Sequence, residues 1–229
     1  MGRASARAFK GPVKRGMTMK LYDLERSGNC YKIRLLLAFL GQAYERVPVA
    51  LDAGAQRASE FLRLNPRGQI PVLVTDEGTA IWDSTAILVY LARRYGKEQW
   101  LPGDPLGMAR VMQWLALEQN EGRYGTARAR VIGLGLKGAL GQTGSLEESR
   151  RLAEIAFATL EERLAHHAWL AADHPTIADI ACYPYTTLYP ESGLTLDGYP
   201  AIHAWFARLE AWPGYIPVPR RPAAEHRRP

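Results

Sequence analysis

The segment NPRGQIPVL, residues 65–73, constrains the fold more than any other part of this chain. Pro71 stands directly before an apolar run, and a proline, which has no N–H, is tolerated in a sheet at the first residue of a strand. A cis peptide bond between Ile70 and Pro71 would turn the chain sharply. It would leave the N–H and C=O of Ile70 facing outward, free to pair with a peptide-like ligand. An ordinary trans-proline turn is the alternative.

Short elements of alternating type surround this segment. Residues 30–41 are apolar nearly all round, which is typical of a buried helix. A glycine-bearing turn at 76–79 predicts a hairpin, so the last two strands are antiparallel. The full expectation is an α/β unit with a mixed sheet, with strands at 19–23, 44–49, 72–75 and 80–82 and helices at 30–41, 59–64 and 83–95.

The second half of the chain lacks strand signals. The sequence LPGDP at 101–105 is rich in turn residues and marks a boundary. Apolar residues then recur at helical spacing and predict an all-α bundle with helices at 106–124, 146–166, 176–189 and 200–212, and a loop or broken helix end at 133–144. The expected domains are an α/β domain at 19–97, a linker at 98–105 and an all-helical domain at 106–215, between a basic extension at 1–18 and an irregular tail at 216–229.

The formal net charge of +6 is concentrated at the two ends of the chain. Residues 1–18 carry five basic residues and no acid, and residues 219–229 carry four arginines against one glutamate. The net charge of the remaining residues, 19–218, is therefore −2. A nucleic-acid-binding fold carries its basic patch on the folded body, so we expect no nucleic-acid partner. Residues 1–18 lack the apolar core of a secretory signal, and we interpret them as a disordered extension before Met19; a transit peptide is the alternative.

Cysteine and histidine placement bears on compartment and metal content. Cys30 and Cys182 form neither a CxxC pair nor a metal-ligand spacing, which favours a reducing, cytoplasmic location. His166 and His167 have no matching ligand partners, so we expect no metal. No apolar run approaches the ~20 residues of a membrane span, so we expect no membrane partner.

A helix is expected to begin at Trp82-Asp83-Ser84. Free N–H groups at a helix N-terminus attract a carboxylate, and the Ser84 hydroxyl adds a donor. The Asp83 carboxylate can pair with an ammonium group. Together the two residues suit the head group of an amino acid, which carries both charges. Simple N-capping is the alternative.

The loop Ser27-Gly28-Asn29-Cys30 precedes the apolar helix. A hydroxyl or amide at a helix N-terminus can donate to a thiolate and lower the pKa of the thiol. The nucleophile would then belong to a ligand and not to the protein. N-capping is the alternative role for Ser27.

These motifs, in this order and at these spacings, resemble the cytosolic glutathione transferase superfamily over residues 19–212. Members share an N-P-x-G-x-[IV]-P-x-L stretch with a cis-proline, an [ED]-S pair that opens the next helix, and an [ST]-x-x-D capping box, matched here by Thr176 and Asp179. The resemblance implies a thioredoxin-like N-terminal domain that binds glutathione as co-substrate. It also implies an all-helical C-terminal domain that completes the substrate site, and a homodimer.

The resemblance implies roles for five residues around the ligand. Asp83 and Ser84 would hold the γ-glutamyl end of glutathione. The backbone of Ile70, before the cis-Pro71, would pair with the cysteinyl part. Gln69 is a candidate for the glycyl carboxylate.

Three residues are candidates for contact with the thiol. Ser27 falls where theta- and zeta-like members place a catalytic serine, and Asn29 falls where nu-like bacterial members place an asparagine. Cys30 is similar to the cysteine of members that form mixed disulfides with glutathione, and the helix N-terminus would lower its pKa. Its position one turn into a buried helix favours an inert thiol instead. The tyrosine of the alpha, mu and pi classes has no match in this loop, because Tyr22 lies inside the first strand.

The expected reaction is attack of the glutathione thiolate on an electrophilic small molecule. Glutathione-dependent disulfide reduction and a non-catalytic binding module are the alternatives. Four side chains near the end of the first long helix either line the electrophile's pocket or face solvent: Gln119, Arg123, Tyr124 and Arg128. The sequence does not identify the electrophile.

Overall fold

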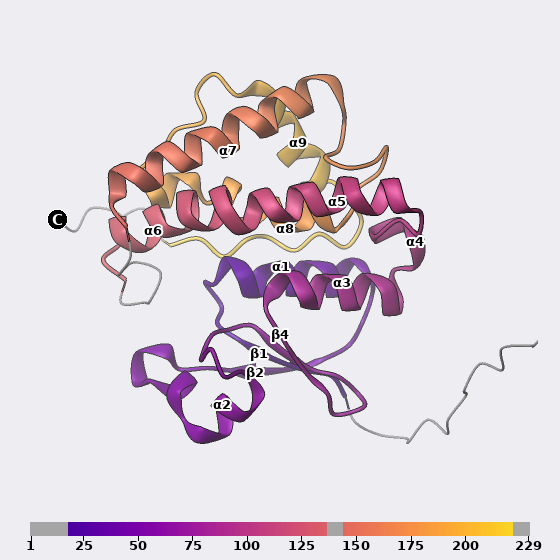
Figure 1. Ribbon diagram of the computed structural model, residues 1–229, viewed down its shortest axis with the longest axis vertical. Helices are drawn as coiled ribbons and strands as arrows, with labels where there is room; N and C mark the ends of the chain where they lie inside the picture. Colours follow the sequence, from indigo (N-terminus) through magenta and orange to yellow (C-terminus); the bar gives the residue numbers. More distant parts are fainter. Residues whose placement is uncertain (1–17, 137–143, 222–229) are drawn as a thin grey trace, which may run out of the picture.

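The computed structural model describes residues 18–136 and 144–221 (Figure 1). The basic extension, apart from residue 18, lies outside the described residues, as do 137–143 of the glycine-rich stretch and 222–229 of the tail. An α/β unit comes first in the chain and packs against a layer of helices formed by the second half (Figure 1). The expected fold class is confirmed.

Within the described residues the sheet has four strands in the order β2-β1-β3-β4. They are β1 (Lys20–Asp23), β2 (Glu45–Pro48), β3 (Val72–Val74) and β4 (Ala80–Trp82). β1 is parallel to β2 and antiparallel to β3, and β3 is antiparallel to β4, so the prediction of a mixed sheet is confirmed. Leu21 lies opposite Leu73 at the centre of the sheet, and both are fully buried.

The other elements are helical. In the first half they are α1 (Gly28–Phe39), η1 (Leu51–Ala53), η2 (Ala55–Arg57), α2 (Ser59–Leu64) and α3 (Ser84–Tyr95). In the second half they are α4 (Lys97–Trp100), α5 (Pro105–Leu117), the π-helix η3 (Glu118–Ala127), α6 (Arg128–Gly133), α7 (Leu146–His166), α8 (Ile177–Thr187), η5 (Tyr189–Ser192) and α9 (Pro200–Glu210). The bounds of α2 and α7 agree with the predictions, whereas α4 was not predicted. Across the part of the chain that is described, no helix combines the length and the apolar content of a membrane span.

α1 lies between the sheet and the helical layer (Figure 1). It packs against α3 on its own side and against α8 of the second unit. A helix in this position has no solvent face, which explains why it is apolar nearly all round and why Leu35, Leu36 and Leu37 are fully buried. Gly28, in its first turn, lies so close to α8 that a Cβ there would be 2.7 Å from the Tyr185 ring.

The predicted helix at 106–124 is longer and less regular than its sequence indicates. α5, η3 and α6 follow one another without a break, and η3 has π-helical geometry. Gly125 lets this wider helix lie against α7, because a Cβ at that position would be 2.6 Å from the backbone nitrogen of Ala153. A residue with no side chain is needed for this approach.

Replacing Gly125 with alanine is expected to lower the thermal midpoint by several degrees, because the added methyl group overpacks the contact with α7 at a cost of about 1–3 kcal/mol. Gly122, on the same π-helix, is the matched control, since a Cβ there meets nothing closer than 3.6 Å. Thermal unfolding followed by circular dichroism measures both variants. Equal midpoints for Gly125→Ala and Gly122→Ala would contradict the close approach.

α8 begins with the predicted capping box, which is confirmed. The Thr176 N–H donates to the Asp179 carboxylate at 2.9 Å, and the Ala178 N–H donates to the Thr176 hydroxyl at 3.2 Å. The Leu170 N–H and the Trp205 indole N–H also donate to Asp179, both at 3.1 Å. Burial raises the pKa of Asp179 from 3.8 to about 6, although these donors act in the opposite direction. One buried carboxylate therefore joins three segments of the helical unit.

The described chain after α9 is irregular but is tied to the rest of the fold. The Tyr31 hydroxyl on α1 donates to the Ile216 carbonyl at 2.6 Å. The Arg220 guanidinium donates to the carbonyl and hydroxyl oxygens of Thr187, at the end of α8, both at 2.8 Å. This segment therefore runs back along the boundary between the two units (Figure 1).

Candidate functional site

The peptide bond between Ile70 and Pro71 is cis, as predicted. Asn65, which is 1% exposed, holds the loop in shape. Its side-chain amide donates to the Gln69 carbonyl at 2.7 Å, and its side-chain oxygen accepts from the Arg67 N–H at 3.0 Å. Within the described residues, the N–H and C=O of Ile70 make no hydrogen bond. This short backbone edge is available to an extended ligand.

α3 begins beside the same loop, with Asp83 as its N-cap. One Asp83 oxygen accepts from the Thr85 N–H at 2.9 Å, and the other lies 3.4 Å from the Arg67 guanidinium. Asp83 has a φ of +75°, a left-handed value that is rare outside glycine. Strained residues of this kind cluster at functional sites. Ser84 follows at the first helical position and is 3% exposed.

The predicted ligand-binding residues meet around one small pocket. Its walls come from both units of the fold: the first turn of α1, the cis-proline loop, the start of α3 and the π-helix η3. The lining residues are Asn29, Asn65, Arg67, Gln69, Ile70, Pro71, Trp82, Asp83, Ser84 and Arg123. The structure therefore brings the cis-proline motif, the helix start and the thiol loop to a single place.

Of the three candidates for contact with a thiol, Asn29 alone lines this pocket. Its side chain is half-buried, and its oxygen accepts a hydrogen bond from the Lys32 ammonium at 2.8 Å. Ser27 is the N-cap of α1, and its hydroxyl oxygen accepts from the Cys30 N–H at 3.3 Å. This bond uses a lone pair of Ser27 and not its proton, so capping does not exclude a second role as a donor.

Cys30 is fully buried in α1. Burial raises the pKa of its thiol to about 12, and the nearby Asp23 carboxylate acts in the same direction. The expectation that the helix N-terminus would lower this pKa is wrong, because desolvation of the thiolate outweighs the helix and the hydrogen bond from Ser27. Burial also raises the pKa of Cys182, which lies in the core on α8.

Comparison with known proteins decides the family. The model for "Glutathione S-transferase, N-terminal domain" matches residues 17–93, and the model for "Glutathione S-transferase, C-terminal domain" matches residues 142–213. The chain belongs to the glutathione transferase superfamily. The crystal structure of a glutathione S-transferase from Pseudomonas fluorescens is similar, with a TM-score of 0.80 at 38% identity over 88% of this chain and 99% of that one.

Two curated relatives show how varied the superfamily is. Maleylacetoacetate isomerase of Pseudomonas aeruginosa is 34% identical, over 80% of this chain and 87% of that protein. Disulfide-bond oxidoreductase YfcG of Escherichia coli is 30% identical, over 81% of this chain and 87% of that protein. Membership therefore supports a glutathione-dependent enzyme but leaves the class of reaction open.

Two residues that lie next to the pocket were not identified from the sequence. Lys32 is fully buried on α1, and its ammonium lies 2.5 Å from a carboxylate oxygen of Glu118, the first residue of η3. A lysine within an apolar helix was the available signal, since a buried ammonium requires a partner. The partner lies 86 residues later in the chain, and no local pattern identifies it.

The four side chains predicted to line the electrophile's pocket or to face solvent lie in different surroundings. Arg123 lines the pocket, and Gln119 donates to the Thr85 hydroxyl at 2.8 Å, at the start of α3. Tyr124 is 39% exposed. Arg128 is buried and donates to residues at the start of α7. Gln119 and Arg123 therefore belong to the site region, whereas Arg128 holds helices together.

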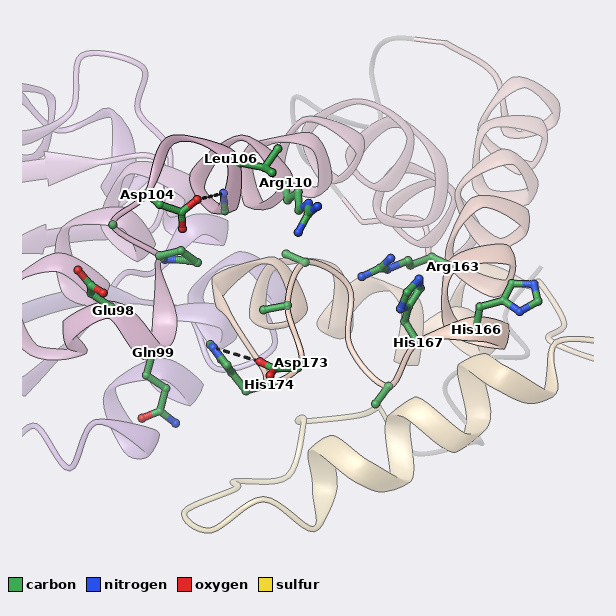
Figure 2. A pocket seen from close by; sticks show the side chains of 16 residues that line it. Glu98, Gln99, Asp104, Leu106, Arg110, Arg163, His166, His167, Asp173 and His174 are labelled. Carbon is green, nitrogen blue, oxygen red and sulfur yellow. Dashed lines mark hydrogen bonds and ion pairs between the residues drawn. The ribbon is translucent and has the colours of Figure 1, made fainter.

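A larger groove of about 1070 Å³ lies away from this pocket, between the α4–α5 junction, the end of α7 and the loop before α8 (Figure 2). Arg110 and Arg163 reach into it from facing helices, with His167 beside Arg163 (Figure 2). None of the predicted ligand or thiol residues line it. Among residues 18–136 and 144–221, no three or more His, Cys, Asp or Glu side chains are grouped to hold a metal ion.

Proposed function

We propose that this protein activates the thiol of glutathione for attack on an electrophilic small molecule. The proposal rests on one observation: Asn29, the unpaired backbone edge of Ile70 and the first residues of α3 all line the same pocket. A tripeptide with its cysteinyl backbone on Ile70 spans from the helix start to the thiol loop.

Each end of glutathione meets groups of matching chemistry in this proposal. The γ-glutamyl ammonium pairs with Asp83, and its carboxylate accepts hydrogen bonds from Ser84 and the free N–H groups at the start of α3. Gln69 is available to the glycyl carboxylate. Arg67 and Arg123 add positive charge around a ligand whose net charge is negative.

Asn29 is the proposed donor to the glutathione sulfur. A hydrogen bond from its amide and the partial positive charge at the N-terminus of α1 both favour the thiolate, so both lower the pKa of the thiol. The thiolate then attacks the electrophilic carbon, a sulfur–carbon bond forms, and the leaving group departs with its electron pair. Ser27, whose capping bond uses a lone pair and not its proton, is the second candidate donor.

Two other reactions would use the same thiolate. In disulfide reduction, favoured by the similarity to YfcG, the thiolate attacks a disulfide, one sulfur joins glutathione in a mixed disulfide and the other leaves as a thiolate. This exchange requires no cysteine of the protein, in keeping with the burial of Cys30. Isomerisation of maleylacetoacetate is the candidate favoured by the other relative.

The purified protein is expected to be retained on immobilised glutathione and to turn over an aryl halide faster than a mixed disulfide or maleylacetoacetate. Replacing Ser84 with alanine is expected to raise the KM for glutathione about tenfold, because a hydrogen bond to a charged group contributes about 1.5 kcal/mol. Steady-state kinetics with glutathione as the varied substrate measure this change.

Ser59→Ala is the matched control, since Ser59 opens α2, is exposed and its hydroxyl donates to the neighbouring Glu60 carboxylate. Its KM for glutathione should equal that of the wild type. If the protein is retained on glutathione but turns over none of the three substrates, it is a non-catalytic binding module and the proposal is wrong. If the mixed disulfide or maleylacetoacetate is turned over faster than the aryl halide, that reaction, and not conjugation, is the function of the protein.

A further inference from the structure

The Lys32 ammonium sits at the centre of a buried polar cluster beneath the pocket. It donates to Glu118 at 2.5 Å and to the side-chain oxygen of Asn29 at 2.8 Å, and it lies 5.4 Å from the centre of the Tyr185 ring. Lys32 is 0% exposed and the side chain of Glu118 is 3% exposed. Of these groups, Asn29 is the one that also lines the pocket.

The hydrogen bond from Lys32 determines which way the Asn29 amide faces. An ammonium has donors and no acceptor, so the atom of Asn29 that meets it must be the oxygen. The NH₂ group of the same amide then points away from Lys32. Asn29 itself lines the pocket, so an NH₂ group that faces away from Lys32 is available there as a donor. The reversed amide would offer an acceptor there and would repel a thiolate.

Glu118 ties this orientation to the second unit of the fold. A buried ammonium is costly without a counter-charge, and Glu118 supplies it from the π-helix. Its other oxygen accepts from the Gln119 amide at 3.0 Å, which also donates to the Thr85 hydroxyl at 2.8 Å. The cluster thus connects the thiol loop on α1, the π-helix and the first turn of α3.

We propose that the buried Lys32–Glu118 pair is a positioning device that holds the Asn29 amide with its NH₂ toward the glutathione sulfur. This inference rests on the proposed function, in which Asn29 is the donor to that sulfur. Lys32 and Glu118 touch neither glutathione nor the electrophile and act through Asn29. The charged residues that line the pocket itself, Arg67, Asp83 and Arg123, stay unchanged in every variant below.

The test is a double variant, Lys32→Met with Glu118→Leu. Either single change leaves a buried charge unpaired and endangers folding, whereas removing both charges with side chains of similar volume is often neutral for stability. We expect the double variant to raise the pKa of the bound glutathione thiol by about 1 and to lower kcat about tenfold or more. The KM for glutathione and the thermal midpoint should stay near wild type. The ultraviolet absorbance of the thiolate as a function of pH measures the thiol pKa directly.

Arg130 and Glu191 provide the matched control. They form a second buried ion pair, at 2.6 Å, within the helical unit and outside the pocket lining. The variant Arg130→Met with Glu191→Leu should leave the pKa of the bound thiol unchanged. An equal rise in both double variants would show a general effect of lost charge and would overturn the inference.

Combination with Asn29→Ala separates positioning from a direct charge effect. If Lys32 acts through Asn29, the triple variant has the same thiol pKa as Asn29→Ala alone. A further rise in the triple variant would show that the ammonium acts on the thiolate directly. If Asn29→Ala itself leaves the thiol pKa unchanged, Asn29 is not the proposed donor; if it raises the pKa and the Lys32→Met/Glu118→Leu variant does not, only the positioning role fails.

Discussion

An Asn29→Ala variant is expected to lose about 100-fold or more in kcat, because one oriented donor to an anion in an active site is worth about 2.7–4 kcal/mol. The KM for glutathione should change little, since in the proposed binding mode Asp83, Ser84 and Ile70 hold the tripeptide. The thermal midpoint should also change little, because Asn29 is only half-buried. Steady-state kinetics with both substrates varied provide the measurement.

Three further variants make this result specific. Asn120→Ala removes an exposed amide from the π-helix, where it donates to the Ala116 carbonyl at 3.0 Å, and should leave kcat unchanged. Cys30→Ala should retain kcat within about twofold, since a buried thiol with a raised pKa is inert. Loss of activity in Ser27→Ala, with activity kept in Asn29→Ala, would transfer the donor role to Ser27.

The second large effect is expected on stability. Asp179→Ala should lower the free energy of unfolding by about 3–5 kcal/mol, because it leaves the N–H groups of Thr176, Leu170 and Trp205 buried without an acceptor. Denaturant unfolding gives this difference as a lower midpoint at an unchanged slope.

Asp179→Asn tests whether shape alone is sufficient at this position. The amide has the shape of the carboxylate, but its NH₂ group faces donors wherever it is placed, so a loss of about 1–3 kcal/mol is expected. Asp173→Asn is the control, because its side chain is 98% exposed, and it should change stability by about 0.5 kcal/mol at most. Equal unfolding midpoints for the Asp179 and Asp173 variants would show that the capping cluster does not stabilise the fold.

The Asp179 variants should also differ in pH dependence. Because burial raises the pKa of Asp179 from 3.8 to about 6, the folded state holds this proton more tightly than the unfolded state. Its contribution to stability is therefore fully present below the unfolded pKa and is lost as pH rises through about 6. The stability advantage of the wild type over Asp179→Asn should be larger at the acidic end of this range than at its neutral end.

The parts of the fold that could be predicted are those with local signals. α2 ends where the following Pro66 requires an extended residue before it. α7 begins after Ser145, whose hydroxyl accepts from the Glu148 N–H at 3.0 Å. The cis-proline motif and the Asp83 cap are local in the same sense, and they supplied the residues of the pocket lining other than Asn29 and Arg123. α4, with four residues, is too short for a periodic pattern.

The features that could not be predicted depend on contacts between distant parts of the chain. The π-helix that begins at Glu118 coincides with the close approach of Gly125 to α7, and no periodicity in the sequence records either feature. The raised pKa of Cys30 follows from complete burial beneath the helical layer, which outweighed a sound local argument about helix ends. Lys32 and Glu118 meet only because the two units pack together.

The burial of Cys30 affects how readily this protein is chemically modified. A sulfur that is inaccessible and protonated resists peroxides and alkylating agents, which react with thiolates. In the proposed reaction the vulnerable sulfur arrives with each glutathione molecule and departs with each product. In that reaction chemical modification falls on glutathione, which is replaced, and Cys30 is spared.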